Sequence, residues 1–143
     1  MILADTGFWL ALANRRDRHH ASAKLVSARL RERLVTTWPV LTETCHLLMR
    51  LGVGAEIAFM RGAAQGAFDL FDLRASHFPR IAKLLEKYQD LPMDLADASL
   101  VIAAEELRSG RILSTDQRDF RTYKWKHHKP FKNLLLPATS SGG

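Results

Sequence analysis

The chain contains almost no cysteine, since Cys45 is the single one among its 143 residues. An internal disulfide is therefore excluded, and we expect a protein of a reducing compartment, most simply the cytoplasm. Cys45 is predicted to be a small buried side chain rather than a nucleophile. No apolar run is long enough to cross a bilayer. The apolar start lacks a preceding basic segment and is interrupted by Asp5, so we expect neither a membrane anchor nor a signal peptide.

The remaining composition is that of a globular protein. Hydrophobic residues make up 47% and charged residues 25% of the chain, and this length is enough for one domain with a real core. We expect a single domain over residues 1–137, followed by a disordered end at 138–143 rich in serine and glycine. The formal net charge of +6 is compatible with nucleic-acid binding but does not establish it.

Short apolar runs alternate with amphipathic segments along the chain. Strands are predicted at 2–4, 34–37, 68–73 and 111–115. Helices are predicted at 8–13, 18–32, 39–51, 53–66, 75–88 and from 91 to a stop at Gly110. Asp69 and Asp72 interrupt the third strand, which favours a position near the edge of the sheet. This alternation predicts an α/β protein with a parallel sheet covered by helices on both faces.

Four acidic residues from distant parts of the chain are predicted to meet at one edge of this sheet. Asp5 and Asp116 directly follow the first and fourth strands. Glu43 lies one turn into the helix after the second strand, and Asp97 lies near the start of the helix that leads to the fourth. In a parallel sheet of this kind, ligands bind beyond the carboxyl ends of the strands.

Clustered carboxylates repel one another, and they stay ionised together when a cation neutralises them. Oxygen ligands without cysteine or histidine favour Mg²⁺ or Mn²⁺, which activate water and neutralise a phosphoryl group under attack. We therefore predict a metal pocket with Asp5, Asp97 and Asp116 as ligands and Glu43 as a further catalytic residue. Thr6 and Ser114 are placed to orient the carboxylates through hydrogen bonds.

Each acid also has a purely structural interpretation. Asp5 is suited to cap the first helix, Asp97 to favour the positive end of its own helix, and Asp116 to form a turn. Glu43 is also compatible with an exposed helix position. Asp94 is at least as well explained as an N-cap, because "DLAD" has capping-box spacing.

Basic and aromatic residues alternate in "YKWKHHKPFK" at 123–132. Phosphates are attracted by basic side chains and bases stack on aromatic rings, so Lys124 and Lys126 are predicted to contact RNA, as is Arg15 from a second basic cluster. The alternative is a solvated basic edge. A separate set of apolar side chains is compatible either with a groove for a partner helix or with the core: Trp9, Trp38, Phe59 and Met60.

Four stretches together resemble the acidic motifs of the PIN domain family: "MILADTGFWLAL", "LTET", "MDLADASLVIAAEEL" and "RILSTDQRDF". The resemblance covers nearly the whole chain and is most like a VapC-type ribonuclease toxin. It implies a three-layer α/β/α sandwich with a central parallel sheet, and Mg²⁺- or Mn²⁺-dependent endoribonuclease activity. It assigns metal and catalytic roles to Asp5, Glu43, Asp97 and Asp116, and an auxiliary role to Asp119. It also implies a homodimer and a cognate antitoxin protein.

Other functions remain open at this point. A PIN-fold RNA-processing nuclease would need the same acids but no antitoxin, and a non-catalytic RNA-binding module would need only the basic surface. A haloacid-dehalogenase-like phosphatase is disfavoured, because it requires Asp-x-Asp after the first strand and Asp5 is followed by Thr6 and Gly7. The spacing of a receiver domain is also not evident.

Overall fold

The computed structural model describes residues 1–136 of the chain, so the disordered end predicted at 138–143 lies outside the described residues. Its centre is a five-stranded parallel sheet in the order β3-β2-β1-β4-β7. The strands are β1 (Ile2–Ala4), β2 (Leu34–Thr36), β3 (Asp69–Leu70), β4 (Arg111–Leu113) and β7 (Lys132–Asn133). A separate antiparallel hairpin pairs β5 (Lys124–Trp125) with β6 (Lys129–Pro130).

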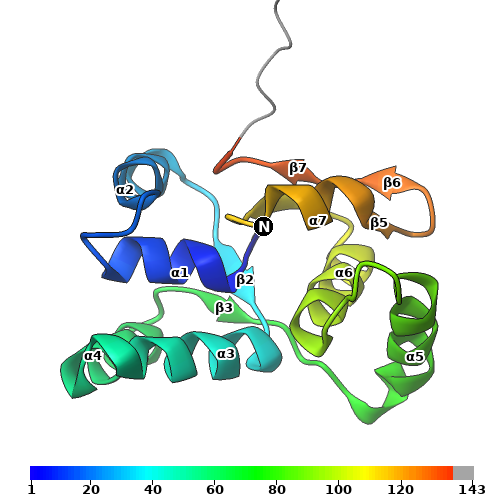
Figure 1. The fold of residues 1–143 in the computed structure, drawn as a ribbon, viewed down its shortest axis with the longest axis horizontal. Helices are drawn as coiled ribbons and strands as arrows, with labels where there is room; N and C mark the ends of the chain where they lie inside the picture. The colour runs from blue at the N-terminus through cyan, green and yellow to red at the C-terminus, as the bar shows by residue number, and fades with distance from the viewer. Residues whose placement is uncertain (137–143) are drawn as a thin grey trace, which may run out of the picture.

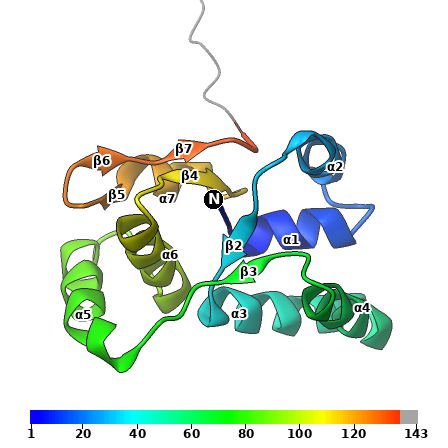
Figure 2. The ribbon, with the colours of Figure 1, turned by 180° about the vertical axis from the view of Figure 1, so that it is seen from behind.

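Helices flank the sheet on both sides, as Figure 1 shows. In that view α1 and α2 lie to the left of the strands, α3 and α4 run below β2 and β3, and α5 and α6 lie to the lower right, and the reverse view in Figure 2 agrees. They are α1 (Thr6–Ala13), α2 (His20–Arg29), α3 (Trp38–Leu48), α4 (Val53–Ala64), α5 (Phe78–Lys87), α6 (Leu95–Leu107) and α7 (Gln117–Thr122), with short 3₁₀ turns η1 (Met49–Leu51) and η2 (Ala75–His77). The predicted α/β/α sandwich with a central parallel sheet is confirmed. Over residues 1–136, every helix is too short or too polar to cross a lipid bilayer.

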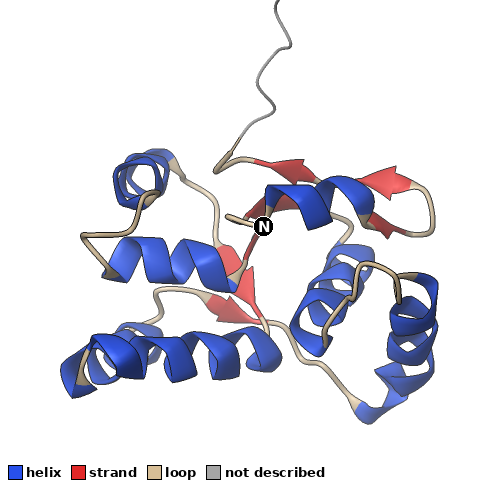
Figure 3. Ribbon diagram, viewed as in Figure 1, coloured by secondary structure: helices blue, strands red, loops and turns tan. Residues whose placement is uncertain are grey.

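The sheet differs from the sequence prediction at its two edges. The third strand is at one edge, as predicted, but it covers only Asp69–Leu70 instead of 68–73. The other edge is β7, which comes from the segment that was predicted only as a basic tail (Figure 3). The two residues of β7 are polar, and its position depends on hydrogen bonds from the Lys132 amide to the Gly110 carbonyl (2.8 Å) and from the Leu134 amide to the Ile112 carbonyl (2.8 Å). Such pairing is a tertiary contact that periodicity does not reveal.

The core is built around α6, in which Ala96 and every residue from 98 to 104 are buried. A helix that is apolar on all sides belongs in the interior, and α6 packs against α3, α5, β1 and β5. It ends at Leu107, and Arg108 caps it in the left-handed conformation with φ of 55°. The prediction that Gly110 stops this helix is therefore wrong. Gly110 is needed for space instead, because a Cβ there would lie 2.2 Å from Nε1 of Trp125.

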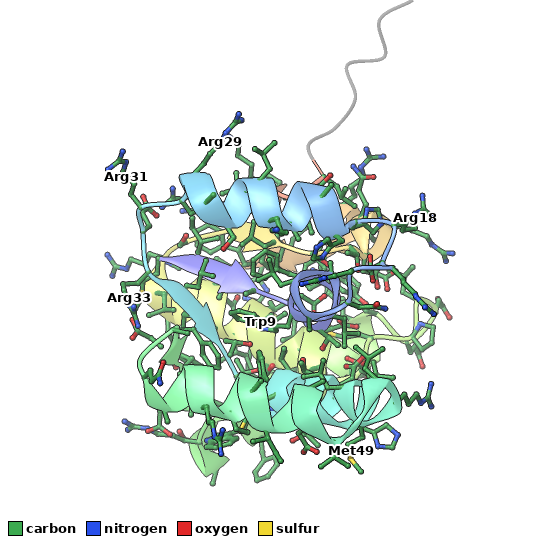
Figure 4. The ribbon with its side chains drawn as sticks, turned by 90° about the vertical axis from the view of Figure 1, so that its left-hand side faces the viewer. Trp9, Arg18, Arg29, Arg31, Arg33 and Met49 are labelled. Atoms are coloured by element: carbon green, nitrogen blue, oxygen red, sulfur yellow. The ribbon has the colours of Figure 1, made fainter. Side chains whose placement is uncertain are left out.

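The apolar residues that were compatible with a partner groove divide between core and surface. Trp9 is buried with Phe59 and Phe68 around it, at centroid distances of 5.5 and 4.8 Å. Figure 4 shows Trp9 between the layers of the molecule. Trp38, in contrast, is 60% exposed at the start of α3. Cys45 is half-buried, and this burial raises the pKa of its thiol. The thiol is therefore not activated as a nucleophile.

The start of α1 lies very close to the loop after β4. A Cβ added to Gly7 would lie 1.8 Å from Oγ1 and 2.9 Å from Cβ of Thr115. We expect Gly7→Ala to lower the free energy of unfolding by about 1–3 kcal/mol, because the loop must shift to relieve this overlap. Urea denaturation measures the change.

Gly62→Ala in α4 is the matched control, since its Cβ would meet only Cβ of Ala67 at 4.0 Å. This substitution should raise the free energy of unfolding by about 0.4–1 kcal/mol, because alanine has less freedom to lose when the helix forms. A Gly7→Ala protein as stable as the parent would contradict the close packing described above.

Candidate active site at the carboxyl edge of the sheet

The pairing of β1 with β4 brings the first two acids together. Ala4 lies opposite Leu113, and the Asp5 amide donates to the Leu113 carbonyl at 3.0 Å. Asp5 and Ser114 are therefore level with each other at the strand ends. The buried Ser114 hydroxyl donates to Oδ2 of Asp5 (3.0 Å) and accepts from the Asp116 amide (2.9 Å). Ser114 thus ties the two acid-bearing loops to each other.

Asp5 is also the N-cap of α1, since its Oδ1 accepts from the Thr6 amide at 2.8 Å. The structural role and the predicted site role of this residue therefore coexist. Asp116 has the same dual position, because it caps α7 and accepts from the Asp119 amide at 3.2 Å.

Glu43 and Asp97 reach the same edge from two helices. Thr37 caps α3, and its hydroxyl is 2.6 Å from that of Ser99 on α6, with both side chains buried. This contact fixes the start of α3 against the first turns of α6. Asp97 sits in a capping box, where its amide donates to Asp94 (2.8 Å) and its Oδ2 accepts from the Asp94 amide (3.3 Å).

Six acidic side chains line one cavity of about 300 Å³. They are Asp5, Glu43, Asp94, Asp97, Asp116 and Asp119. Thr6, Gly7 and Thr115 are among the other lining residues, and none of the described residues that line the cavity is a lysine, arginine or histidine. Ser114 supports the cavity from behind and does not line it.

The negative charges in the cavity are not balanced by basic side chains among its described lining residues. Burial, with repulsion from Asp94 and Asp5, raises the pKa of Asp97 to about 8. Burial, with repulsion from Glu43 and Asp116, raises the pKa of Asp5 to about 6. Burial and the contact with Asp116 raise the pKa of Asp119 to about 6. Glu43 is exposed on α3 at the edge of the cavity, and the loss of water around its carboxyl group together with repulsion from Asp94 raises its pKa.

The residues present fit a hard divalent cation, because they offer carboxylate oxygens and an excess of negative charge. Within residues 1–136, however, no three Asp, Glu, His or Cys side chains are already arranged as a ligand set. The protein instead engages both oxygens of Asp5, through Ser114 and the Thr6 amide, and one oxygen of Asp97, through Tyr123 and the Asp94 amide. The assignment of Asp5, Asp97 and Asp116 as metal ligands stays a prediction.

Tyr123 is a site residue that sequence reasoning missed. Its side chain is fully buried between Tyr88 and Phe120, with ring centroids at 5.0 and 5.3 Å, and its hydroxyl donates to Oδ2 of Asp97 at 3.1 Å. Burial and the neighbouring acids raise the pKa of its phenol, so it remains a hydrogen-bond donor. The signal in the sequence was the spacing, because Asp116, Asp119 and Tyr123 follow one another at intervals of three and four along one helix face.

The predicted RNA-contacting residues do not line the cavity. Nζ of Lys124 donates to the Arg121 carbonyl (3.3 Å), and Nζ of Lys126 lies 5.9 Å from the Trp125 ring centroid. Arg15 is exposed in the loop between α1 and α2. Other arginines, Arg18, Arg29, Arg31 and Arg33, project outward on the α2 side of the molecule (Figure 4). RNA contact by Lys124, Lys126 and Arg15 stays a prediction.

The raised pKa values determine how stability should depend on pH in the presence of a chelator. Between pH 5 and pH 8, Asp5, Asp97 and Asp119 hold more protons in the folded than in the unfolded state, where a carboxyl pKa is near 3.8. The free energy of unfolding must therefore fall as the pH rises through this window. We expect Tm, followed by circular dichroism, to be lower at pH 8 than at pH 5.

Asp97→Asn removes the group with the highest pKa, so it should raise Tm at pH 8 and flatten the pH dependence. Glu86→Gln changes an exposed acid on α5 and should behave like the parent protein. A Tm that rises steadily from pH 5 to pH 8 would contradict the electrostatic description.

Comparisons with known proteins agree with the geometry. The sequence profile of the PIN domain matches residues 2–126. Ribonuclease VapC26 of Mycobacterium tuberculosis is 32% identical over 120 residues, which are 83% of this chain and 89% of that protein. The crystal structure of Mycobacterium tuberculosis VapC20, a toxin that cleaves the sarcin-ricin loop, superposes with a TM-score of 0.76 at 24% identity, over 82% of this chain and 92% of VapC20. From these matches and from the acids at the sheet edge, the chain belongs to the PIN domain family, in which it resembles the VapC-type members.

Proposed function

We propose that this chain is a cytoplasmic endoribonuclease that hydrolyses RNA phosphodiester bonds with a carboxylate-bound Mg²⁺ or Mn²⁺ ion. We further propose that it is the toxin of a toxin–antitoxin pair. The observation that carries the proposal is the cavity lined by six acids and, among its described lining residues, by no basic side chain. The two relatives, a ribonuclease and a sarcin-ricin loop cleaving toxin, support RNA as the substrate.

In this proposal Asp5, Asp97 and Asp116 would hold the ion. A divalent ion in such a site supplies charge neutralisation at the scissile phosphate and a water that ionises near neutral pH. Glu43 orients the attacking water and accepts its proton. Partial loss of water around the carboxyl group and repulsion by Asp94 raise the pKa of Glu43, which makes it a stronger base than a glutamate without such neighbours. In-line attack of the water oxygen on phosphorus would break the bond to the 3′-oxygen, which takes a proton from solvent, and leave 5′-phosphate and 3′-hydroxyl ends.

The auxiliary residues keep the acids in place. Ser114 donates to Oδ2 of Asp5, whose Oδ1 accepts from the Thr6 amide, and Tyr123 and the Asp94 amide donate to the same oxygen of Asp97. The other oxygen of Asp97 is thereby left for the ion, and Asp5 would bind it through a second lone pair of one of its oxygens. The Thr6 hydroxyl stabilises the charged form of Glu43 and so opposes the rise in its pKa. Asp119 lies one turn beyond Asp116 on α7 and adds negative charge to the same cavity.

Substituting the acids should abolish cleavage. We expect Asp5→Asn and Asp97→Asn to lower the rate of RNA cleavage in Mn²⁺ at least about 100-fold, because each removes a negative ligand oxygen. The products of labelled single-stranded RNA are separated on a gel, with and without EDTA. Glu86→Gln is the matched control and should cleave like the parent.

Three outcomes of this experiment would contradict the proposal: undiminished cleavage in EDTA, full activity of either Asp variant, or products that carry a 2′,3′-cyclic phosphate. Circular dichroism of each variant confirms that the loss is not one of folding.

Basic side chains outside the cavity are proposed to bind the RNA backbone. Each phosphate contact adds to the salt dependence of binding, so Lys124→Ala, Lys126→Ala and Arg15→Ala should each reduce the slope of log K against log salt by about 0.7–1. Fluorescence anisotropy of a labelled RNA at several salt concentrations measures the slope. Lys83→Ala, an exposed position on α5, is the control. An unchanged slope for a variant means that its side chain contacts no phosphate.

A homodimer and the cognate antitoxin are the proposed protein partners. Support comes from an exposed apolar surface on η1 and α4, made by Met49, Leu51, Val53, Ile57 and Met60. Met49 is 59% exposed and projects from the outside of the molecule in Figure 4. Several exposed apolar side chains on neighbouring elements are typical of a protein interface.

A further inference from the structure

A second hollow lies directly beside the acidic cavity, between the start of α3 and the start of α6. It has a volume of about 670 Å³, and its apolar walls are Trp38, Pro39 and Leu95. Thr42, Glu43, His46, Asp94 and Ala96 complete the lining. We call this hollow the Trp38 groove. Because Glu43 and Asp94 line both spaces, the Trp38 groove adjoins the candidate active site.

The exposure of Trp38 has no explanation in the packing of the fold. Its side chain is 60% exposed, and Leu95 across the groove is 47% exposed. The helix does not need an indole at this position, since Thr37 supplies the cap and Pro39 favours the first turn. A tryptophan and a leucine left in water beside a site are typical of a surface that binds something.

The charges of the Trp38 groove restrict what it binds. Glu43 and Asp94 are negative, and neither lysine nor arginine is found among the described residues that line the groove. A phosphate is therefore repelled, whereas a nucleobase carries no charge and has a flat face that stacks on an indole. Base amino groups are donors, and carboxylates such as Asp94 accept from them.

We propose that the Trp38 groove is a base-binding subsite, in which Trp38 stacks an unpaired nucleobase next to the phosphodiester held at the acids. The inference rests on the proposed ribonuclease function and deepens it, because it requires the substrate to be single-stranded or looped at the cleavage position. A stacked base beside the scissile bond fixes which phosphate reaches Asp5 and Asp97. The groove thereby contributes to the choice of cleavage site.

Binding of short single-stranded RNA by the full chain tests this proposal. The Asp97→Asn background prevents cleavage during the measurement, with Mg²⁺ present throughout. Trp38→Ala should weaken binding about 10-fold or more, which is the loss expected for one stacked base, while Trp38→Phe keeps an aromatic face and should stay within about threefold of the parent. Phe78→Ala is the matched control, because Phe78 is 68% exposed on α5 and lines neither space.

RNAs with a single abasic nucleotide, moved stepwise along the strand, identify the stacked base. At one position the abasic RNA should bind the parent about 10-fold more weakly, and there Trp38→Ala should cause no additional loss. The base-binding subsite would be overturned if the loss of affinity from Trp38→Ala and the loss from the abasic nucleotide added at every position. It would also be overturned if the Trp38→Ala protein bound RNA like the parent. Both outcomes leave the ribonuclease proposal standing.

Two further outcomes distinguish the remaining possibilities. If the parent neither binds nor cleaves RNA, the ribonuclease proposal and the subsite are both wrong. If Trp38→Ala leaves RNA affinity unchanged but lowers the mass measured by light scattering, the groove is an interface between protein copies and the base-binding proposal is wrong.

Discussion

Asp5 and Ser114 lie level with each other because β1 and β4 pair in parallel, with Ala4 opposite Leu113. The arrangement of the candidate site depends on this register. It lets Ser114 bridge Asp5 and the Asp116 loop, and it places the N-terminus of α1 so close to Thr115 that only glycine fits at position 7. A slip of one residue would turn every side chain of the strand to the opposite face. The apolar side chains of both strands are buried, so the hydrophobic effect that stabilises the core also fixes the acids.

The same cavity is a source of instability. Carboxylates that are buried, as Asp5 is, or partly buried, as Asp97 is, and that repel one another cost free energy, which is expressed here in their raised pKa values. The rest of the fold offsets this cost, above all α6, whose residues 98 to 104 are all buried. A helix so deeply packed holds its first turn, and therefore Asp97, in a fixed position. The well-packed helix α6, which stabilises the fold, thus lies directly beside the acidic cavity, which destabilises it.

The C-terminal segment supports the site more than its basic composition suggests. Glu105 on α6 forms two hydrogen bonds to the guanidinium of Arg80 on α5, both at 2.9 Å, and accepts from the Lys126 amide at the start of the hairpin turn. This carboxylate joins two helices and the hairpin. Just before the hairpin, Tyr123 is buried and binds Asp97. The aromatic residues of this segment therefore fill the core and orient an acid, and the exposed Trp38 is left as the aromatic face beside the candidate site.

The sequence by itself determined the α/β class, the edge position of the third strand and the list of acids at the carboxyl edge. Strand periodicity and chain direction are local properties that suffice to place Asp5 and Asp116 after parallel strands. Only the tertiary structure decided the strand β7, the role of Gly110 as a space for Trp125, and the contact between Tyr123 and Asp97. These features depend on contacts between residues far apart in the chain, or on the volume left between packed elements. The local pattern of a short segment reveals neither the contacts nor the volume.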